Sequence, residues 1–427
     1  MAFVIKFAKN VRNHWKKSVF AAALLTYGAS YAGDKIRINN LMRDYCLEAS
    51  KYGQVTMPVT DPPREILVLL NPAANKRSAE ETFKKYCEPI LHLGGFLVNI
   101  VKTDSEGHAR RYVEELTTFP SAILVAGGDG TLSEVVTGVL RKNYSNHNCP
   151  IGMLPLGRMN SSSDEDFPLK KANRVEEARQ LGEAAISVLR GNVRRKHVMK
   201  IEVVSEAEEE QRRPVYAVGS FQWGAFRDIL SRRDQYWYTG SLREYTAFLI
   251  NSFSSRPTWD CAGSIKYTPP CAGCRNCVRV EKKTPSKDKW WSGFTPKTTT
   301  SSSSVQSKDF SGIENEMCSQ EFLLTDKHSE VIVATSRAKP YGCLQMKLAD
   351  PEDSSFSFIL NSWRRLHDNT SLHRDPIEAR TVEIHPDSSV FTNKEKYYAL
   401  DNEEYDVKPI KITLIPHAIN MFSSGKM

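Results

Sequence analysis

The sequence feature that most limits the fold is a glycine-rich turn between an apolar run and an amphipathic run. Residues 122–126 are AILVA and lead into Gly127-Gly128-Asp129-Gly130, and the apolar side chains after Thr131 share one helical face. A glycine turn of this kind lets a phosphate approach the backbone, where free N–H groups and the helix dipole favour negative charge. We therefore expect a strand, a phosphate-binding turn and a helix over residues 122–142.

The turn differs from better-known phosphate-binding loops because it contains an acidic residue, Asp129. The turn lacks the G-x-G-x-x-G spacing of dinucleotide sites and the lysine of the P-loop. A carboxylate beside phosphates adds repulsion unless it holds Mg²⁺ or accepts a proton from an incoming hydroxyl. Asp129 is therefore our candidate catalytic residue and magnesium ligand. The expected phosphate contacts are Gly127, Gly128, Gly130 and Thr131.

The spacing Thr131-x-x-Glu134 has two interpretations. It fits a capping box, in which the glutamate returns to the N-terminus of its own helix. It also places Glu134 where it could contact a nucleotide. The same spacing in Thr103-x-x-Glu106 is explained by capping alone, whereas both interpretations stay open for Glu134.

Hydrophobic patterning predicts two folded domains after a connector. Over residues 61–192, apolar runs at 66–70, 96–101, 122–126 and 151–154 alternate with helical segments, which is typical of an α/β domain with a parallel sheet. Residues 193–427 instead carry short alternating segments, which predict a mainly antiparallel β domain. Residues 281–312 are rich in Lys, Ser and Thr and predict a disordered insertion.

Positive charge is concentrated at the N-terminus. Of the net charge of 58 − 50 = +8, residues 1–60 carry nine basic and three acidic residues, or +6. A nucleic-acid-binding protein would spread basic residues over its folded body, so nucleic acid is not an expected partner. Residues 18–32 are uncharged, and as a helix they span about 22 Å, less than a hydrocarbon core of about 30 Å. Residues 1–60 thus fit a mitochondrial targeting segment, a cleaved secretory signal, a marginal anchor or a helix packed on the body.

Four of the nine cysteines form a C-x9-C-x2-C-x2-C cluster: Cys261, Cys271, Cys274 and Cys277. Two overlapping C-x-x-C steps could supply a structural zinc site. Disulfides in an oxidising compartment and unstructured thiols are the alternatives, and all three stay open.

The order of motifs resembles the diacylglycerol kinase catalytic family, which includes sphingosine and ceramide kinases. The matching residues are Asn71-Pro72, Thr103 with Gly107-His108-Ala109, Gly127–Thr131 with Glu134, and Pro155-Leu156-Gly157. The family continues with PLGTxNDF, whereas this chain has Arg158 in place of Thr and Ser161 in place of Asp, and keeps Asn160.

The resemblance implies an N-terminal nucleotide-binding α/β domain, a C-terminal lipid-binding β domain, and a site between them for ATP and Mg²⁺. Asn71, Thr103, Gly157 and Arg243 would then contact the nucleotide. Asp401-Asn402-Glu403 resembles the family's Asp-Gly-Glu motif. Glu403 would be a general base, with Asp129 or Glu404 as alternatives, and Asp401 would be an outer-sphere magnesium partner. Arg243 and residues 401–403 could equally be solvated surface.

Within the family, the basic N-terminus and the runs at 90–95, 100–104 and 137–141 look most like the mitochondrial, acylglycerol-phosphorylating branch. That likeness implies phosphorylation of a monoacylglycerol or diacylglycerol to lysophosphatidic or phosphatidic acid at a mitochondrial membrane, with the inner membrane or intermembrane space favoured. The alternatives are a sphingosine or ceramide kinase, or a non-catalytic subunit of an inner-membrane complex such as an import translocase.

Overall fold

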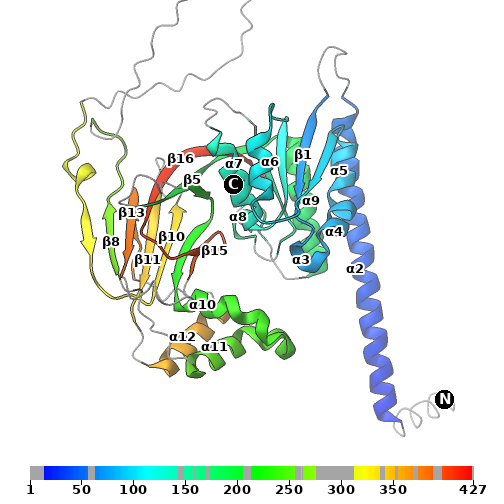
Figure 1. Ribbon diagram of the computed structural model, residues 1–427. Coiled ribbons are helices and arrows are strands. Elements are labelled where there is room, and N and C mark those ends of the chain that lie inside the picture. Colours follow the sequence, from blue (N-terminus) through cyan, green and yellow to red (C-terminus); the bar gives the residue numbers. More distant parts are fainter. Residues whose placement is uncertain are drawn as a thin grey trace, which may run out of the picture.

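The computed structural model of the 427-residue chain describes two sheets flanked by helices, with one long helix at the side (Figure 1). The described residues are 14–55, 63–142, 149–157, 160–164, 166–168, 173–204, 213–254, 261, 263–275, 312–336, 342–351, 354–368, 374–387 and 397–425. Residues 281–311 of the predicted insertion 281–312 lie outside this set, as do Arg158 and Cys277.

The N-terminal part of the first sheet is parallel, as predicted. Its order is β2-β1-β3-β4, with bounds β1 (Glu65–Leu70), β2 (Leu97–Lys102), β3 (Ala122–Gly127) and β4 (Ile151–Pro155). Side chains alternate between the two faces of a strand, and both faces here are covered. Ile66, Val68 and Leu70 join one buried cluster, and Leu67 and Leu69 join another. Continuous apolar runs are what a parallel strand covered on both faces requires.

Two groups of helices cover these faces. One cluster contains residues of α4 (Ala79–Tyr86), α5 (Glu88–Leu93) and α9 (Arg174–Arg190). The opposite cluster contains residues of α6 (His108–Glu115) and α7 (Asp129–Arg141). Short helices α3 (Ala74–Arg77) and α8 (Ser161–Asp164) follow β1 and β4. The glycine turn after β3 is therefore held between a fully buried strand and a helix packed on the sheet.

The second sheet is antiparallel throughout, so the predicted fold class is confirmed. Its order is β12 (Ile377–Ala379), β11 (Cys343–Ala349), β10 (Glu330–Ser336), β7 (Ser220–Gly224), β14 (Tyr397–Leu400) and β15 (Glu403–Asp406). One buried cluster joins this sheet, through residues such as Phe221 and Val331, to the antiparallel part of the first sheet, through residues such as Met199 and Ile412.

The first sheet continues beyond β4 into the C-terminal half of the chain. β16 (Ile410–Phe422) pairs with β5 (Val193–Val203) and β13 (Thr381–Pro386), and its Met421 pairs in parallel with Ile151 of β4. β6 (Val215–Ala217) pairs with β5, while β8 (Gly263–Thr268) and β9 (Phe322–Leu324) extend the sheet past β13. The last strand of the chain thus completes a sheet begun by the first.

A helical unit lies below the second sheet in Figure 1. It consists of α10 (Ala225–Ser231), the 3₁₀ segment η2 (Arg232–Leu242), α11 (Arg243–Ser254) and α12 (Ser355–Asp368), around a small core that contains Phe248 and Phe358. Arg243 is the one residue of this unit that the sequence analysis named.

The long helix α2 (Trp15–Gly53) forms most of the N-terminal segment 1–60 that precedes the first domain. Ile38, Tyr45 and Ala49 are buried against the body, whereas Phe20, Leu25 and Tyr27 are more than two-thirds exposed. The N-terminal half of α2 therefore projects beyond the body, as Figure 1 shows. Among the described residues, no helix combines the length and the apolar character needed to cross a bilayer.

Candidate active site

The glycine turn places Asp129 at the first position of α7. The helix begins at Asp129, with extended Gly128 before it, two residues earlier than the expected start at Thr131. Asp129 is 2% exposed. One carboxylate oxygen accepts the Ser161 N–H at 2.9 Å, the Ser161 hydroxyl at 2.7 Å and the Asn402 amide at 3.3 Å, and the other accepts the Ser162 N–H at 3.0 Å. Asp129 is thus fixed by four donors.

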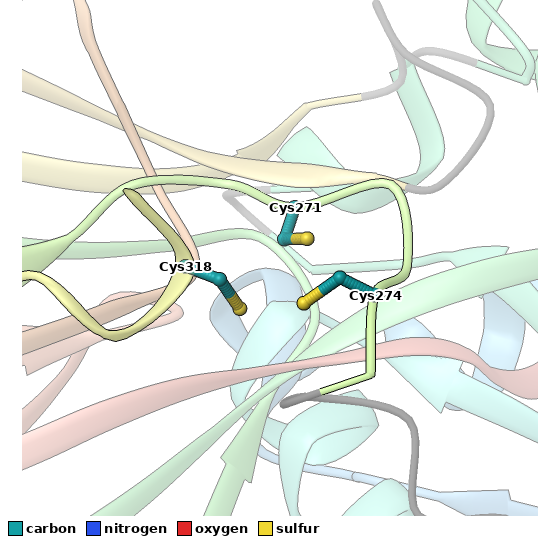
Figure 2. A group of neighbouring side chains, drawn as sticks. All are labelled: Cys271, Cys274 and Cys318. Carbon is teal, nitrogen blue, oxygen red and sulfur yellow. The ribbon is translucent and has the colours of Figure 1, made fainter. Parts of the chain in front are cut away.

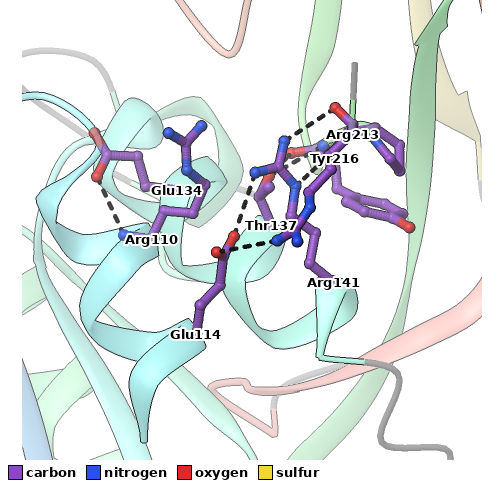
Figure 3. A network of polar contacts seen from close by, with 8 residues as sticks. Arg110, Glu114, Glu134, Thr137, Arg141, Arg213 and Tyr216 are labelled. Atoms are coloured by element: carbon purple, nitrogen blue, oxygen red, sulfur yellow. Dashed lines mark hydrogen bonds and ion pairs between the residues drawn. The ribbon is translucent and has the colours of Figure 1, made fainter. Parts of the chain in front are cut away.

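Glu134 does not close a capping box, so that interpretation was wrong. Its carboxylate accepts the backbone N–H groups of Gly107 at 2.7 Å, Ala109 at 3.1 Å and Arg110 at 3.4 Å, which lie at the start of α6. Figure 3 shows Glu134 reaching from α7 to Arg110. A carboxylate at a helix N-terminus satisfies N–H groups that have no partner within the helix. Glu134 therefore ties two neighbouring helices together.

The same face of α7 carries a second polar network. The Thr137 hydroxyl donates to the Tyr216 carbonyl at 3.2 Å and accepts the Tyr216 N–H at 3.0 Å. Arg141 donates to Glu114 and to the carbonyl of Arg213 (Figure 3). These contacts fix α7, and so the orientation of its N-terminus, against α6 and β6.

The C-terminal half contributes a tight turn at Asp401 and Asn402. Both residues have positive φ, 49° and 69°, in a region that asparagine and aspartate tolerate better than other non-glycine residues. The Asp401 carboxylate accepts the N–H groups of Val218, Gly219 and Ser220 at 2.8–2.9 Å. Burial raises the pKa of Asp401 to about 7, against the opposing effect of these hydrogen bonds. The turn is thus anchored to the start of β7.

Glu403 leaves this turn and lies over the glycine loop. A Cβ atom on Gly130 would collide with Oε1 of Glu403, so the two residues are in direct apposition. Burial raises the pKa of Glu403 to about 7, and the nearby negative charge of Glu134 adds to the effect. The Tyr405 hydroxyl donates to Oε2 at 3.2 Å and works in the opposite direction by stabilising the charged form. A carboxylate of this kind exchanges a proton near neutral pH.

A cavity of about 540 Å³ surrounds these groups and brings together most of the predicted site. The predicted residues that line it are Asn71, Gly128, Asp129, Gly130, Thr131, Gly157, Asp401, Glu403 and Glu404. Gly127 lies behind the loop, where its carbonyl accepts the N–H groups of Leu156 and Gly157. Thr103, Glu134 and Arg243 are not part of the lining.

Gly157, which follows β4, packs closely against the glycine turn. A Cβ atom there would collide with the Cα of Gly128, so two glycines from different loops meet backbone to backbone. Neither of these two glycines places a side chain beside the N-terminus of α7, where a phosphate group needs access to the backbone. The residues present therefore fit a nucleotide phosphate.

Three functional candidates escaped the sequence analysis. Arg227 of α10 lines the cavity and pairs with Glu404 at 2.9 Å, and Arg233 of η2 lines it as well. Ser161, noted only as a departure from the family pattern, is the residue that donates twice to Asp129. A phosphate site is expected to have basic residues nearby, which was the only sequence signal for the two arginines. Which arginines lie near the turn depends on a helical unit that the patterning did not predict.

A neighbouring cavity of about 920 Å³ shares Asn75, Gly157 and Arg233 with the first. It lies between α2, α4, α9 and α11, and Arg243 lines it beside Asn160 and Arg174. Arg243 pairs with Asp234 at 3.4 Å and is one-third exposed. The structure therefore places Arg243 next to the cavity around Asp129 rather than within it.

The predicted cysteine cluster is only partly correct. Cys271 and Cys274 come together, but the third sulfur beside them belongs to Cys318, which the sequence analysis did not include. Cys261 instead bridges to His328 through its backbone, and its thiol donates to the Trp223 carbonyl at 3.7 Å. Cys277 lies outside the described residues.

Comparisons with known proteins agree with this geometry. A family model of the diacylglycerol kinase catalytic domain matches residues 65–201, and one of the acylglycerol kinase C-terminal region matches residues 218–427. The chain is 31% identical over 432 residues to "Acylglycerol kinase, mitochondrial" of Mus musculus, which covers 97% of this chain and 96% of that one. The Xenopus laevis protein of the same name is 39% identical over 63% of this chain and 61% of its own length. "Sphingosine kinase 2" of Arabidopsis thaliana is 29% identical over 42% of this chain and 36% of its own.

Proposed function

Because the chain belongs to the acylglycerol kinase family and is a lipid kinase, we propose that it transfers the γ-phosphate of ATP to a hydroxyl of a monoacylglycerol or diacylglycerol. The products are lysophosphatidic or phosphatidic acid. The observation that carries the proposal is the apposition of Glu403 and Gly130, which puts a proton-accepting carboxylate beside the phosphate-binding end of α7.

Glu403 is the general base in this proposal. Its pKa of about 7 suits proton transfer at neutral pH. Glu404 is instead half-exposed and paired with Arg227 at 2.9 Å. Asp129 has both oxygens occupied by hydrogen bonds from Ser161, Ser162 and Asn402. We assign Asp129 to the positioning of the loop and of the C-terminal turn, rather than to proton transfer.

The chain's own groups also fit the donor phosphates. Gly128, Asp129 and Gly130 at the start of α7 line the cavity, where the N-terminus of a helix favours negative charge. Arg227 and Arg233 add positive charge to the cavity wall. Magnesium, when bound with ATP, neutralises phosphate charge during transfer. Asp129 and Asp401 would hold the ion through water molecules, because their oxygens already accept hydrogen bonds from the protein and magnesium keeps several waters. Arg243 would contact the nucleotide from the neighbouring cavity.

The lipid reaches this site from a membrane surface in our proposal. Trp237 and Tyr238 of η2 and Phe253 of α11 are 63–76% exposed, and η2 also contributes Arg233 to the cavity wall. In Figure 1 the N-terminal end of α2 and the helices α10–α12 lie on the same, lower side of the view. Phe20 and Leu25 of α2 are exposed as well. Aromatic side chains are favoured at membrane–water interfaces. Since the relatives from Mus musculus and Xenopus laevis carry mitochondrial names, we propose a mitochondrial membrane as the location.

A phosphorylation assay tests the proposal. Full-length protein, Mg²⁺ and labelled ATP are incubated with vesicles containing monoacylglycerol, diacylglycerol, sphingosine or ceramide. We expect labelled acylglycerol products, and a loss of at least about 10²-fold in kcat for Glu403→Gln, the scale of general base catalysis. Asp406→Asn is the matched control, because Asp406 is an exposed acid on the same strand that lines neither cavity. Label confined to sphingosine or ceramide would overturn the substrate assignment, and full activity of Glu403→Gln would overturn the assignment of the base.

A further inference from the structure

Three cysteine sulfurs converge away from the cavity around Asp129. Cys271 and Cys274 follow β8, and Cys318 lies in the 3₁₀ turn η4 (Glu316–Ser319). Their sulfur atoms all lie within 4.8 Å of one another, and Cys274 and Cys318 are 0% and 1% exposed (Figure 2). Sulfurs bound to one tetrahedral zinc ion are about 3.8 Å apart, given Zn–S bonds of about 2.3 Å. The cluster therefore has the compactness of a thiolate metal site.

The backbone around the three cysteines is held independently of any ion. Gly273 has a φ of 125°, which turns the chain between Cys271 and Cys274. The Arg275 N–H donates to the Ile313 carbonyl at 3.0 Å, and this bond joins the two segments that carry the sulfurs. β8 and β9, which flank the cluster in sequence, are paired in the sheet. The convergence of the sulfurs is thus part of the fold.

Polar donors point at two of the sulfurs. The Asn315 side-chain amide donates to Cys271 Sγ at 3.3 Å, while its oxygen accepts the Met317 N–H at 3.1 Å. The Arg380 guanidinium donates to Cys318 Sγ at 3.5 Å and to the Cys318 carbonyl at 3.4 Å. Donors of this kind commonly orient metal-bound ligands and balance their charge.

We propose that Cys271, Cys274 and Cys318 bind a structural zinc ion. Binding replaces one proton on each thiol, so three protons are released for each Zn²⁺ taken up. Three thiolates and one Zn²⁺ carry a net charge of −1, which the Arg380 guanidinium offsets. A water molecule or a further protein ligand completes the tetrahedron. The ion closes the chain between Cys274 and Cys318, which are 318 − 274 = 44 positions apart, onto the end of β8.

The role assigned to the ion is stability, since none of the three cysteines lines the cavities around Asp129 or Arg243. Loss of a metal that closes a long loop releases the loop's conformational entropy and lowers the stability of the sheet that carries it. The proposed zinc site is therefore independent of the proposed kinase activity, and an experiment can contradict one proposal without affecting the other.

Metal content of the purified full-length protein is the first test. Elemental analysis should find about one zinc per chain in the wild type and a reduction of at least about fivefold in Cys318→Ser. Cys261→Ser is the matched control, because Cys261 is a buried cysteine shortly before β8 whose thiol donates to the Trp223 carbonyl. Wild-type protein that is free of zinc and joins two of the three sulfurs in a disulfide would overturn the proposal, as would equal zinc loss in both variants.

A second measurement does not depend on the folding of a variant. Zinc is removed from the wild type with a chelator and replaced by Co²⁺, which should give thiolate-to-cobalt charge-transfer absorption and the visible bands of a tetrahedral ion. Removal should lower Tm by several degrees, and added Zn²⁺ should restore it. Absence of the thiolate band, or a Tm that does not change on removal and return of zinc, would overturn the structural role.

Discussion

The side-chain amide of Asn402 donates a hydrogen bond of 3.3 Å to the carboxylate of Asp129, across 273 positions of sequence. Asn402 has a φ of 69°. The sequence analysis noted that the family has glycine here, and the left-handed conformation explains why asparagine can replace it, since both tolerate positive φ. Asparagine also adds a donor that glycine lacks. The substitution therefore keeps the turn and ties it to the glycine loop.

Two substitutions of Asn402 should distinguish the role of its backbone conformation from that of its hydrogen bond to Asp129. Asn402→Gly keeps the positive φ and loses one hydrogen bond of about 1 kcal/mol, so kcat should fall less than about tenfold. Asn402→Val adds the cost of a β-branched residue in this conformation and should lose at least tenfold more activity than the glycine variant. Steady-state kinetics on acylglycerol vesicles checks the prediction, and equal activities of the two variants would contradict it.

Tyr405→Phe should shift the pH dependence of the reaction. The Tyr405 hydroxyl stabilises the charged form of Glu403, so its removal raises the pKa of Glu403 above about 7. Because the base acts when deprotonated, the acidic limb of kcat against pH should move upward by about one unit, since a hydrogen bond to a charged group contributes about 1.5 kcal/mol. An unchanged limb, or one that moves to lower pH, would argue against Glu403 as the titrating base.

Glu403→Gln should stabilise the protein at high pH more than at low pH. The pKa of Glu403 is raised in the fold from 4.5 to about 7, so the charged form is the disfavoured one. The contribution of Glu403 to the free energy of unfolding is fully present below pH 4.5 and is lost as the pH rises through 7. Glutamine does not titrate, so the variant does not suffer this loss. Between pH 5 and pH 8 the variant should gain on the order of 2 kcal/mol relative to wild type. Thermal unfolding at both pH values measures the gain, and a constant difference would oppose the raised pKa.

Gly130→Ala should impair catalysis by displacing Glu403. The new Cβ atom would collide with the Glu403 carboxylate, which has to move away from the N-terminus of α7. A displacement of about 1 Å can cost on the order of 10²-fold in rate. Gly28→Ala, in an exposed helical position with no atom within 4 Å of the added Cβ, is the control and should keep full activity. If both variants retain the wild-type kcat, the apposition has no catalytic role.

Deletion of residues 1–30 should weaken membrane binding without unfolding the body. The deletion keeps Tyr31, whose ring lies beneath the Arg174 guanidinium of the body, and removes the exposed Phe20 and Leu25. Co-sedimentation with vesicles should fall at least about tenfold, while Tm stays within a few degrees of wild type. Leu323→Ala, an exposed leucine of β9, is a control that should bind as wild type does. Undiminished binding by the truncated protein would place the membrane contact elsewhere.

The predictable parts of this molecule are those whose signal is local in sequence. The parallel strands can be recognised in the sequence as continuous apolar runs, because helices cover both of their faces. The capping-box alternative for Glu134 was wrong because the spacing to Thr131 is local, while the partners of Glu134 are N–H groups at the start of another helix. Cys318 was missed for the same reason, since nothing near it in sequence indicates Cys271 and Cys274.

The proximity of Glu403 to Gly130 was expected only through resemblance to a family. Neither residue's neighbours in sequence indicate that a turn after β14 meets the start of α7. Their approach depends on the pairing of β14 with β7 and on the three N–H groups that Asp401 accepts, and all of these are tertiary contacts. Burial then sets the pKa of Glu403, which composition cannot indicate.

The strand β16 has a consequence for how the protein must be made. Its Met421 pairs with Ile151, and its preceding residues pair with β5, so the parallel sheet acquires its neighbour at β4 only from the far end of the chain. A ribosome that has released residues 63–204 has therefore produced β4 and β5 with hydrogen-bonding edges uncovered, and such edges favour wrong pairing. Loss of Ile410–Phe422 should therefore destabilise the nucleotide-binding half as much as substitutions within that half do. Limited proteolysis of a chain that ends at residue 409 can measure this loss of stability.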